Sequence, residues 1–145
     1  MTITRIDMDD DMQQAALAQV QRDWNAAAER WHADRLAEVY TQDALFFGGR
    51  PGHSVGRSAV QDYFATYVGV IESGAMVLAE QHLAQLGPDC LLAQGYVDFS
   101  FTLQGGQQTR SRLRATLVLV REGAAWRIRQ HHFSPTPEAP PLGQS

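Results

Sequence analysis

The sequence holds a single cysteine and no long hydrophobic stretch. Cys90 has no second thiol to pair with, and its place before two leucines indicates a small core residue. No apolar run approaches the ~20 residues that a membrane-spanning helix requires. The opening MTITRIDMDDDM is acidic and contains no cleavable apolar segment. Together these absences predict a cytoplasmic protein that does not act in a membrane.

Positive charge is also scarce. The chain has 12 basic and 16 acidic residues, a formal net charge of -4. The one basic cluster, Arg110, Arg112 and Arg114, alternates along a predicted strand and cannot form a continuous track for phosphates. We therefore expect no nucleic-acid partner.

Motifs for metals and cofactors are missing as well. The five histidines show neither His-x-His nor His-x-x-x-His spacing, so no metal site is predicted. The segment GGRPGHSVG contains several glycines but lacks the Lys-Ser/Thr ending of a phosphate-binding loop. We expect the protein to work without a cofactor.

What is present is typical of one globular domain. Hydrophobic residues make up 44% of the 145 residues. Apolar residues at steps of three and four predict a long helix from about residue 12 to residue 31, with Asp9, Asp10 and Asp11 at its start. A short second helix follows, with Asp34 placed to cap it, and a third covers 57–71. We expect one domain over residues 9–137, between a flexible tail at 1–8 and a proline-rich tail at 138–145.

The second half of the chain changes to a period of two. It predicts strands at 76–86, 90–103, 108–121 and 125–134, after a short strand at 44–48. Turns are expected at Gly87-Pro88-Asp89, Gly105-Gly106 and Glu122-Gly123. Helices followed by an antiparallel meander predict an α+β fold in which the sheet curls into a cone and the helices cover its concave side.

The last hairpin, residues 110–134, carries the only sequence pattern that indicates a functional site. Its first strand places leucines and an alanine on one side and Arg112, Arg114 and Thr116 on the other. In its second strand, strict alternation puts His132 on the side of Trp126 and Ile128. Because arginine and histidine stand in line with valine and isoleucine, we expect the polar row to face a partly polar cavity.

Three stretches resemble a known family: GRSAVQDYF (56–64), GYVDFSF (95–101) and RATLVLVREGAAWRIRQHHFSPTP (114–137). With the order of elements, they are similar to the SnoaL-like branch of the nuclear transport factor 2-like superfamily. The likeness is to the SgcJ/EcaC type and to the association domain of calcium/calmodulin-dependent protein kinase II, over roughly residues 15–137. It implies a cystatin-like, cone-shaped barrel with a deep pocket, which usually forms a homodimer through the outer face of the sheet. Members include isomerases, cyclases, dehydratases and assembly domains, so the fold alone does not fix the function.

The catalytic machinery of ketosteroid isomerase, a relative of this family, is not retained. The place of its general base falls at Phe47 or Gly48, and that of its oxyanion-binding Asp at residues 115–117. Its tyrosine donor is replaced by Trp24. The resemblance therefore argues against a simple isomerase.

Arg114 is the first candidate for a binding residue. A buried, unpaired guanidinium costs several kcal/mol, so it needs a partner or an anionic ligand. The resemblance implies that Arg114 faces the cavity, where it would orient an anionic oxygen. The alternatives are a solvent-facing side chain or an ion pair with Asp98. A two-residue turn at Gly105-Gly106 would put Asp98 and Arg114 on opposite faces, and a three-residue turn on the same face.

His132 and Asp98 are the candidate catalytic residues, since an imidazole beside a carboxylate can transfer protons near neutral pH. The alternative is a structural imidazole, with His131 at a dimer contact on the outer face. The candidates for substrate binding are Arg114, Tyr96, Thr116, Tyr63 and Phe47. These residues predict a small-molecule pocket acting on an aromatic or polyketide-like anion. The alternative is a binding or oligomerisation domain without turnover.

Overall fold

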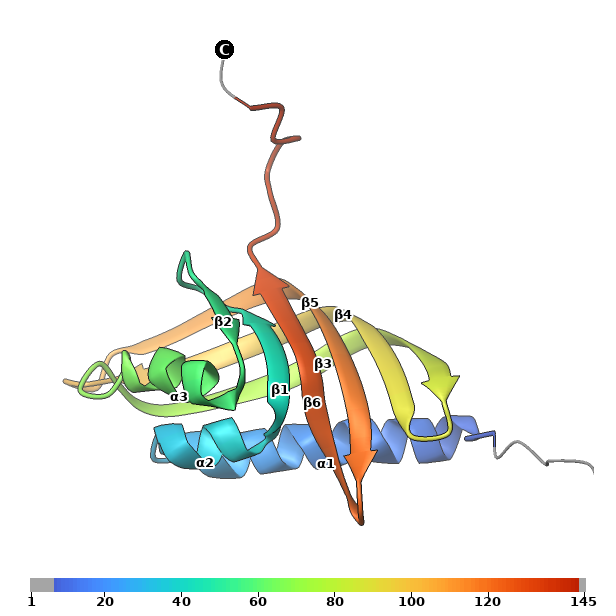
Figure 1. The fold of residues 1–145 in the computed structure, drawn as a ribbon. Coiled ribbons are helices and arrows are strands. Elements are labelled where there is room, and N and C mark those ends of the chain that lie inside the picture. Colours follow the sequence, from blue (N-terminus) through green and yellow to red (C-terminus); the bar gives the residue numbers. More distant parts are fainter. Residues whose placement is uncertain (1–6, 144–145) are drawn as a thin grey trace, which may run out of the picture.

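The computed structural model describes residues 7–143, in which three helices lie against one curved sheet of six strands (Figure 1). The elements follow in the order α1 (Asp10–Ala28), α2 (Ala33–Glu38), β1 (Tyr40–Phe47), β2 (His53–Val55), α3 (Arg57–Ala65), β3 (Ile71–Gly87), β4 (Cys90–Leu103), β5 (Gln108–Glu122) and β6 (Ala125–Ser134). The predicted α+β class is confirmed.

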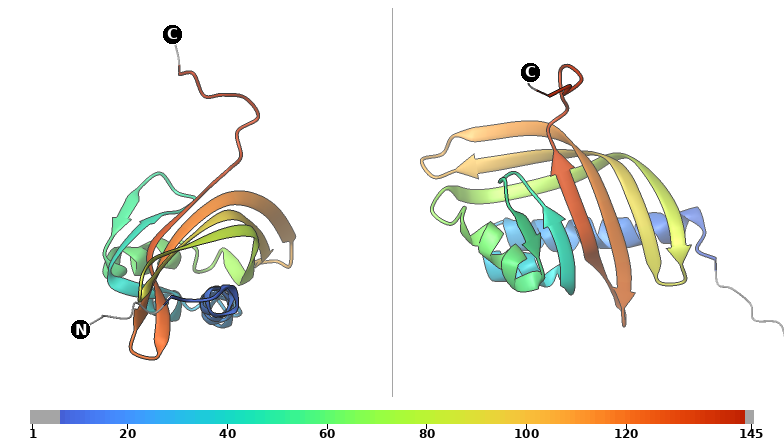
Figure 2. Two further views of the ribbon diagram at one scale, coloured as in Figure 1. Left: turned by 90° about the vertical axis from the view of Figure 1, so that its right-hand side faces the viewer. Right: turned by 45° about the horizontal axis from the view of Figure 1, so that its top comes forward.

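The sheet has the strand order β2-β1-β6-β5-β4-β3, and it curls without closing into a barrel (Figure 2). All neighbours are antiparallel except β1 and β6, which pair in parallel. The helices lie on the concave side, as the cone prediction requires. The long β4 and β5 strands arch over α3 and form the open end of the cone.

Helix α1 is the main support of the concave side. The Asp9 carboxylate accepts a hydrogen bond of 2.8 Å from the Met12 amide, which confirms the predicted N-cap. One face of α1 is buried against the sheet: Ala16, Leu17, Val20, Trp24, Ala27 and Ala28. Side-chain amides beside that face bind strand backbone, and Asn25 both donates to the Met76 carbonyl and accepts from the Met76 amide. The helix is thus fixed in register with the sheet.

Several predicted boundaries differ. Helix α3 ends at Ala65 instead of Ile71, because Thr66, Val68, Gly69 and Val70 disfavour a helix and form turns leading into β3. The second helix is not capped by Asp34, which lies in its first turn; His32 precedes it without a side-chain cap. No strand was predicted at His53 and Ser54, which pair with β1 as strand β2.

The expected tails have different outcomes. Residues 1–6 of the N-terminal tail lie outside the described residues, whereas Met8 is buried and its amide donates to Gln85. Residues 135–143 are exposed and run away from the sheet (Figures 1 and 2). No helix in the described part of the chain is long and apolar enough to cross a membrane.

Candidate functional site

A cavity of about 260 Å³ lies on the concave side, where β4 and β5 arch over α3. Most of its wall is aromatic: Trp24, Trp31, Phe64, Phe99, Phe101 and Phe133. The rings meet one another edge-on, tilted or stacked, with neighbouring centroids 4.9 to 6.2 Å apart, as in Phe99 and Phe101 at 5.6 Å. The volume is close to the lower end of the ~300–1,000 Å³ of small-molecule sites, which suits a ligand of one or two rings.

Trp31 enters this wall in a strained backbone conformation. It follows α1 with a φ of 51°, a left-handed position where glycine is usual. Its indole N–H donates to the Phe64 carbonyl at 3.0 Å, which fixes the ring. A Cβ atom at residue 74 would lie 3.0 Å from both Trp31 and Phe101. The Trp31 ring therefore fits here because residue 74 is a glycine. The chain therefore gives up local stability to place this ring in the cavity wall.

Most polar groups of the cavity gather beside the β1–β2 loop, and Ser111 of β5 is a further polar lining residue. The Gly49 amide donates to the Tyr63 hydroxyl at 2.8 Å, and a Cβ on Gly49 would lie 3.5 Å from the Tyr67 hydroxyl and 3.6 Å from that of Tyr63. Burial, with a further contribution from a hydrogen bond to Tyr67, raises the pKa of Tyr63 above its ordinary value. Both tyrosines line the cavity. They form its polar end, which we call the tyrosine end.

The polar row of the last hairpin does not face this cavity, so that expectation is wrong. On β5 the buried side chains Ala115, Leu117 and Leu119 point to the core, while Arg114 is exposed and Thr116 half-buried on the outer face. The apolar row provides the surface that the helices cover. Guanidinium groups stay in water, because burying them unpaired would cost several kcal/mol.

The predicted orientation of the two histidines is also wrong. His131 is fully buried, and His132 is exposed on the outer face. The reason is a β-bulge: Leu119 pairs with Ile128 and Val118 with Gln130, so Arg129 is an extra residue in β6. One inserted residue exchanges the two faces of every position after it.

His131 lies in the core, next to the aromatic rings that form the cavity wall. Its Nδ1 and the Tyr40 hydroxyl share a hydrogen bond of 2.8 Å, and its ring lies 5.1 Å from that of Phe133. Burial, and to a smaller extent His132, lowers the pKa of His131 from 6.5 to about 3. Burial likewise raises the pKa of Tyr40 far above its ordinary value. Both groups are therefore neutral at pH 7.

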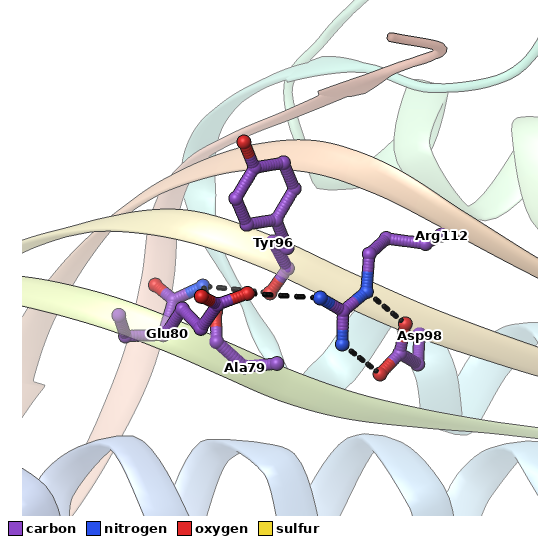
Figure 3. A network of polar contacts seen from close by, with 6 residues as sticks. Ala79, Glu80, Tyr96, Asp98 and Arg112 are labelled. Atoms are coloured by element: carbon purple, nitrogen blue, oxygen red, sulfur yellow. Dashed lines mark hydrogen bonds and ion pairs between the residues drawn. The ribbon is translucent and has the colours of Figure 1, made fainter.

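Asp98 pairs with Arg112 and not with Arg114, the partner considered from the sequence. Arg112 stands opposite it across the β4–β5 ladder, and its Nε and Nη2 donate to the two Asp98 oxygens at 2.7 and 2.9 Å. The third contact of Arg112 is to Glu80, at 2.8 Å (Figure 3). The hydrogen bonds and charge of Arg112 lower the pKa of Asp98. Asp98 and Arg114 do share the outer face, two residues apart in register, but Arg112 binds the carboxylate.

Four of the predicted site residues meet in a groove on the outer face of the sheet. Its volume is about 590 Å³, and Tyr96, Arg114, Thr116 and His132 line it together with Glu80 and His82. The groove follows a bulge in β3, where Glu80 has a φ of 50° and Gly95 leaves room for the Glu80 carbonyl. The catalytic role predicted for His132 and the binding roles of Tyr96, Arg114 and Thr116 stay predictions, and they now concern this outer groove. Asp98 does not line the groove, and its catalytic role also stays a prediction.

The other two predicted binding residues are separated. Phe47 is 41% exposed on the outer face and stacks on His53 at 4.2 Å. Tyr63 alone among the predicted residues lines the concave cavity. Tyr67 also lines the cavity and was not predicted as a binding residue, although its four-residue spacing from Tyr63 in the predicted helix 57–71 was a signal for it. In the structure Tyr67 lies in the turn after α3. Trp31 and Arg50 were not predicted as site residues either, and the sequence gives no comparable signal for them.

No metal centre is formed in the part of the chain that the structure describes, where no three His, Cys, Asp or Glu side chains converge. Trp24, which the resemblance places at the isomerase's tyrosine, lines the cavity. Phe47 is exposed on the outer face, and residues 115 and 117 are apolar.

A curved, open sheet that forms a cone over N-terminal helices, with a cavity at its wide end, is typical of nuclear transport factor 2-like folds. The model of the SnoaL-like domain matches residues 17–138, and the chain belongs to this family. No curated protein matches the sequence.

Solved structures show the same fold. A candidate calcium/calmodulin-dependent protein kinase II association domain from Xanthomonas campestris is 22% identical, with a TM-score of 0.78 over 96% of this chain and 99% of that chain. A candidate dehydratase of the same superfamily from Streptomyces avermitilis is 19% identical, with a TM-score of 0.71 over 88% and 99%. Hexachlorocyclohexane dehydrochlorinase LinA-type3 from Novosphingobium barchaimii is 18% identical, with a TM-score of 0.64 over 87% and 91%.

Proposed function

We propose that this protein binds a small, flat aromatic molecule in the concave cavity. The observation that carries the proposal is the wall itself, in which Trp24, Trp31, Phe64, Phe99 and Phe101 surround a space large enough for one or two rings. Edge-on aromatic contacts favour a planar guest over an aliphatic one of equal size, by about 0.5–1.5 kcal/mol per ring pair. The strained backbone of Trp31 supports a binding role, because such strain is concentrated at functional sites.

The chemistry of the cavity favours binding over histidine-based catalysis. Among the described residues, Tyr63 and Tyr67 are its only titratable lining groups. His132 and Asp98 lie on the opposite face of the sheet, and the neutral His131 is enclosed in the core. Any proton transfer to a bound molecule would fall to the two tyrosines. Relatives of the fold include dehydratases and dehydrochlorinases by name, so such a step is compatible with the scaffold.

The test is calorimetric titration with 2-naphthol, a neutral two-ring probe. We expect saturable binding by the wild type, and a loss of at least ten-fold in affinity for Leu113→Trp, because Leu113 lines the cavity and the larger side chain would fill it. Leu86→Trp is the matched control, since Leu86 is 56% exposed and lies outside the cavity wall. Equal affinity in both variants, or no binding of 2-naphthol and related one- and two-ring probes to the wild type, would contradict the proposal.

A further inference from the structure

Arg50 stands next to the tyrosine end of the cavity. It belongs to the β1–β2 loop, directly after the lining residue Gly49, and its guanidinium carbon lies 4.3 Å above the ring of Tyr67. Its Nε donates to the Thr66 hydroxyl at 2.8 Å. The side chain is therefore held at the rim by stacking and by a hydrogen bond, although it is exposed.

The charge of Arg50 is not neutralised. Within residues 7–143 the ion pairs involve Arg112, Arg121 and Arg129, and none involves Arg50. Its neighbours are a hydroxyl, the carbonyl of Thr66 and an aromatic face, which orient the guanidinium without supplying a negative charge. An arginine kept in place without a carboxylate is suited to an anionic group that arrives from outside.

The two tyrosine hydroxyls add hydrogen-bond donors at the same place. The Tyr63 oxygen already accepts from the Gly49 amide, so what it has left to offer is its own proton. The raised pKa of Tyr63 keeps that proton in place at neutral pH. A hydrogen bond to Tyr67 contributes to the raised pKa of Tyr63, so Tyr63 directs its proton to the Tyr67 oxygen, and the Tyr67 hydroxyl at the end of this short chain can donate to an acceptor oxygen of a ligand.

We propose that the ligand is an aromatic carboxylate that enters ring first and leaves its carboxylate at the tyrosine end, facing Arg50. The proposal rests on the proposed function and adds its substrate class. The orientation follows from the cost of desolvation: the deep wall is apolar and would strongly disfavour a charged group. At the rim, the carboxylate keeps part of its contact with water and gains a guanidinium and hydroxyl donors.

The test compares two probes of nearly equal shape, 2-naphthoate and 2-naphthamide, by calorimetry at pH 7 and low salt. The wild type is expected to bind the anion at least ten-fold more tightly than the amide. Arg50→Gln should remove most of that preference while leaving the affinity for the amide within about two-fold. Tyr67→Phe should weaken the anion less, because it removes one donor and not the charge. Arg22→Gln is the matched control: it also removes one positive charge, from an exposed position on α1.

The possible results separate the two proposals. If both probes bind equally well, or if Arg22→Gln lowers the preference as much as Arg50→Gln, the carboxylate class is wrong while aromatic binding stands. If the amide binds more tightly than the anion, the charge selection is likewise refuted. If neither probe binds and 2-naphthol also fails, the proposed function itself is wrong.

Discussion

At the scale of single residues, His131 shows how the core constrains a titratable group. Its ring is fully buried between Tyr40, Phe46 and Phe133, and Nδ1 has the Tyr40 hydroxyl as its partner, whereas Nε2 has none within the described residues. Protonation would place a charge there without a counter-ion. This explains why burial lowers the pKa of His131 to about 3.

We expect the stability of the protein to fall as the pH is lowered from 7 to 5. In the unfolded chain His131 takes up a proton near its ordinary pKa of 6.5, and in the folded protein only near 3. Below pH 6.5 the unfolded state therefore binds the extra proton, and the free energy of unfolding drops by about 1 kcal/mol per pH unit, or about 2 kcal/mol at pH 5. Urea unfolding at the two pH values measures this loss.

Two variants identify the source of that loss. His131→Asn retains a hydrogen-bonding group toward Tyr40 but does not titrate, so it should remove most of the difference between pH 7 and pH 5. His132→Asn changes the exposed neighbour and should keep the difference. The carboxylates with lowered pKa, Asp43 and Asp98, act below their ordinary value of 3.8 and lie outside this interval. A wild type equally stable at both pH values would show that His131 does not control the acid response.

At the scale of elements, α1 takes the place of a neighbouring strand for β3. Strand β3 is at the edge of the sheet, and its outer backbone groups would otherwise be unpaired. Asn25 binds both the amide and the carbonyl of Met76 at 2.8 and 2.9 Å, and Gln21 accepts from the Leu78 amide at 2.8 Å. These contacts hold the edge strand against the helix.

Asn25→Ala should lower the free energy of unfolding by roughly 2 kcal/mol or more, because it leaves two backbone groups of the buried Met76 without partners. Asn25→Asp keeps the acceptor oxygen and loses the donor, so an intermediate loss is expected. Gln14→Ala, at an exposed position of the same helix, serves as the control. Chemical denaturation compares the three. A loss for Asn25→Ala no larger than that for Gln14→Ala would show that water replaces these bonds.

The bounds of helices and strands could be predicted from the sequence more reliably than the face of each strand that points inward. The bounds of β4 and β6 and the N-cap of α1 follow from local alternation and capping chemistry, which the sequence displays directly. Which face of β6 points inward after Arg129 does not follow from local sequence. The bulge at this point depends on pairing with β5 and β1, and β1 is far away in the sequence. The same limit applies to Arg50, whose place above Tyr67 depends on how the β1–β2 loop returns to α3.

At the scale of the whole molecule, the outer face of the sheet combines apolar and charged surface. Val77 is 53% exposed there, and Leu92, Val118 and Val120 are half-buried along the neighbouring strands. The Arg112–Asp98–Glu80 network (Figure 3) lies beside Val77, which pairs with Asp98, whereas Leu92, Val118 and Val120 lie farther along β4 and β5. A sheet face that carries exposed apolar side chains together with fixed charges is suited to packing against another protein.

We expect this outer face to join two copies of the chain into a homodimer, as the family resemblance implied. The wild type should then show a mass of twice 16.1 kDa by light scattering at micromolar concentration. Val77→Arg should shift the protein toward the monomer, because two added charges would be buried at a symmetric interface. In the monomer this arginine stands opposite Asp98, so the fold should be retained. Val68→Arg, at a valine 63% exposed away from the sheet face, should leave the dimer intact. A monomeric wild type, or equal masses for both variants, would exclude the outer face as the interface.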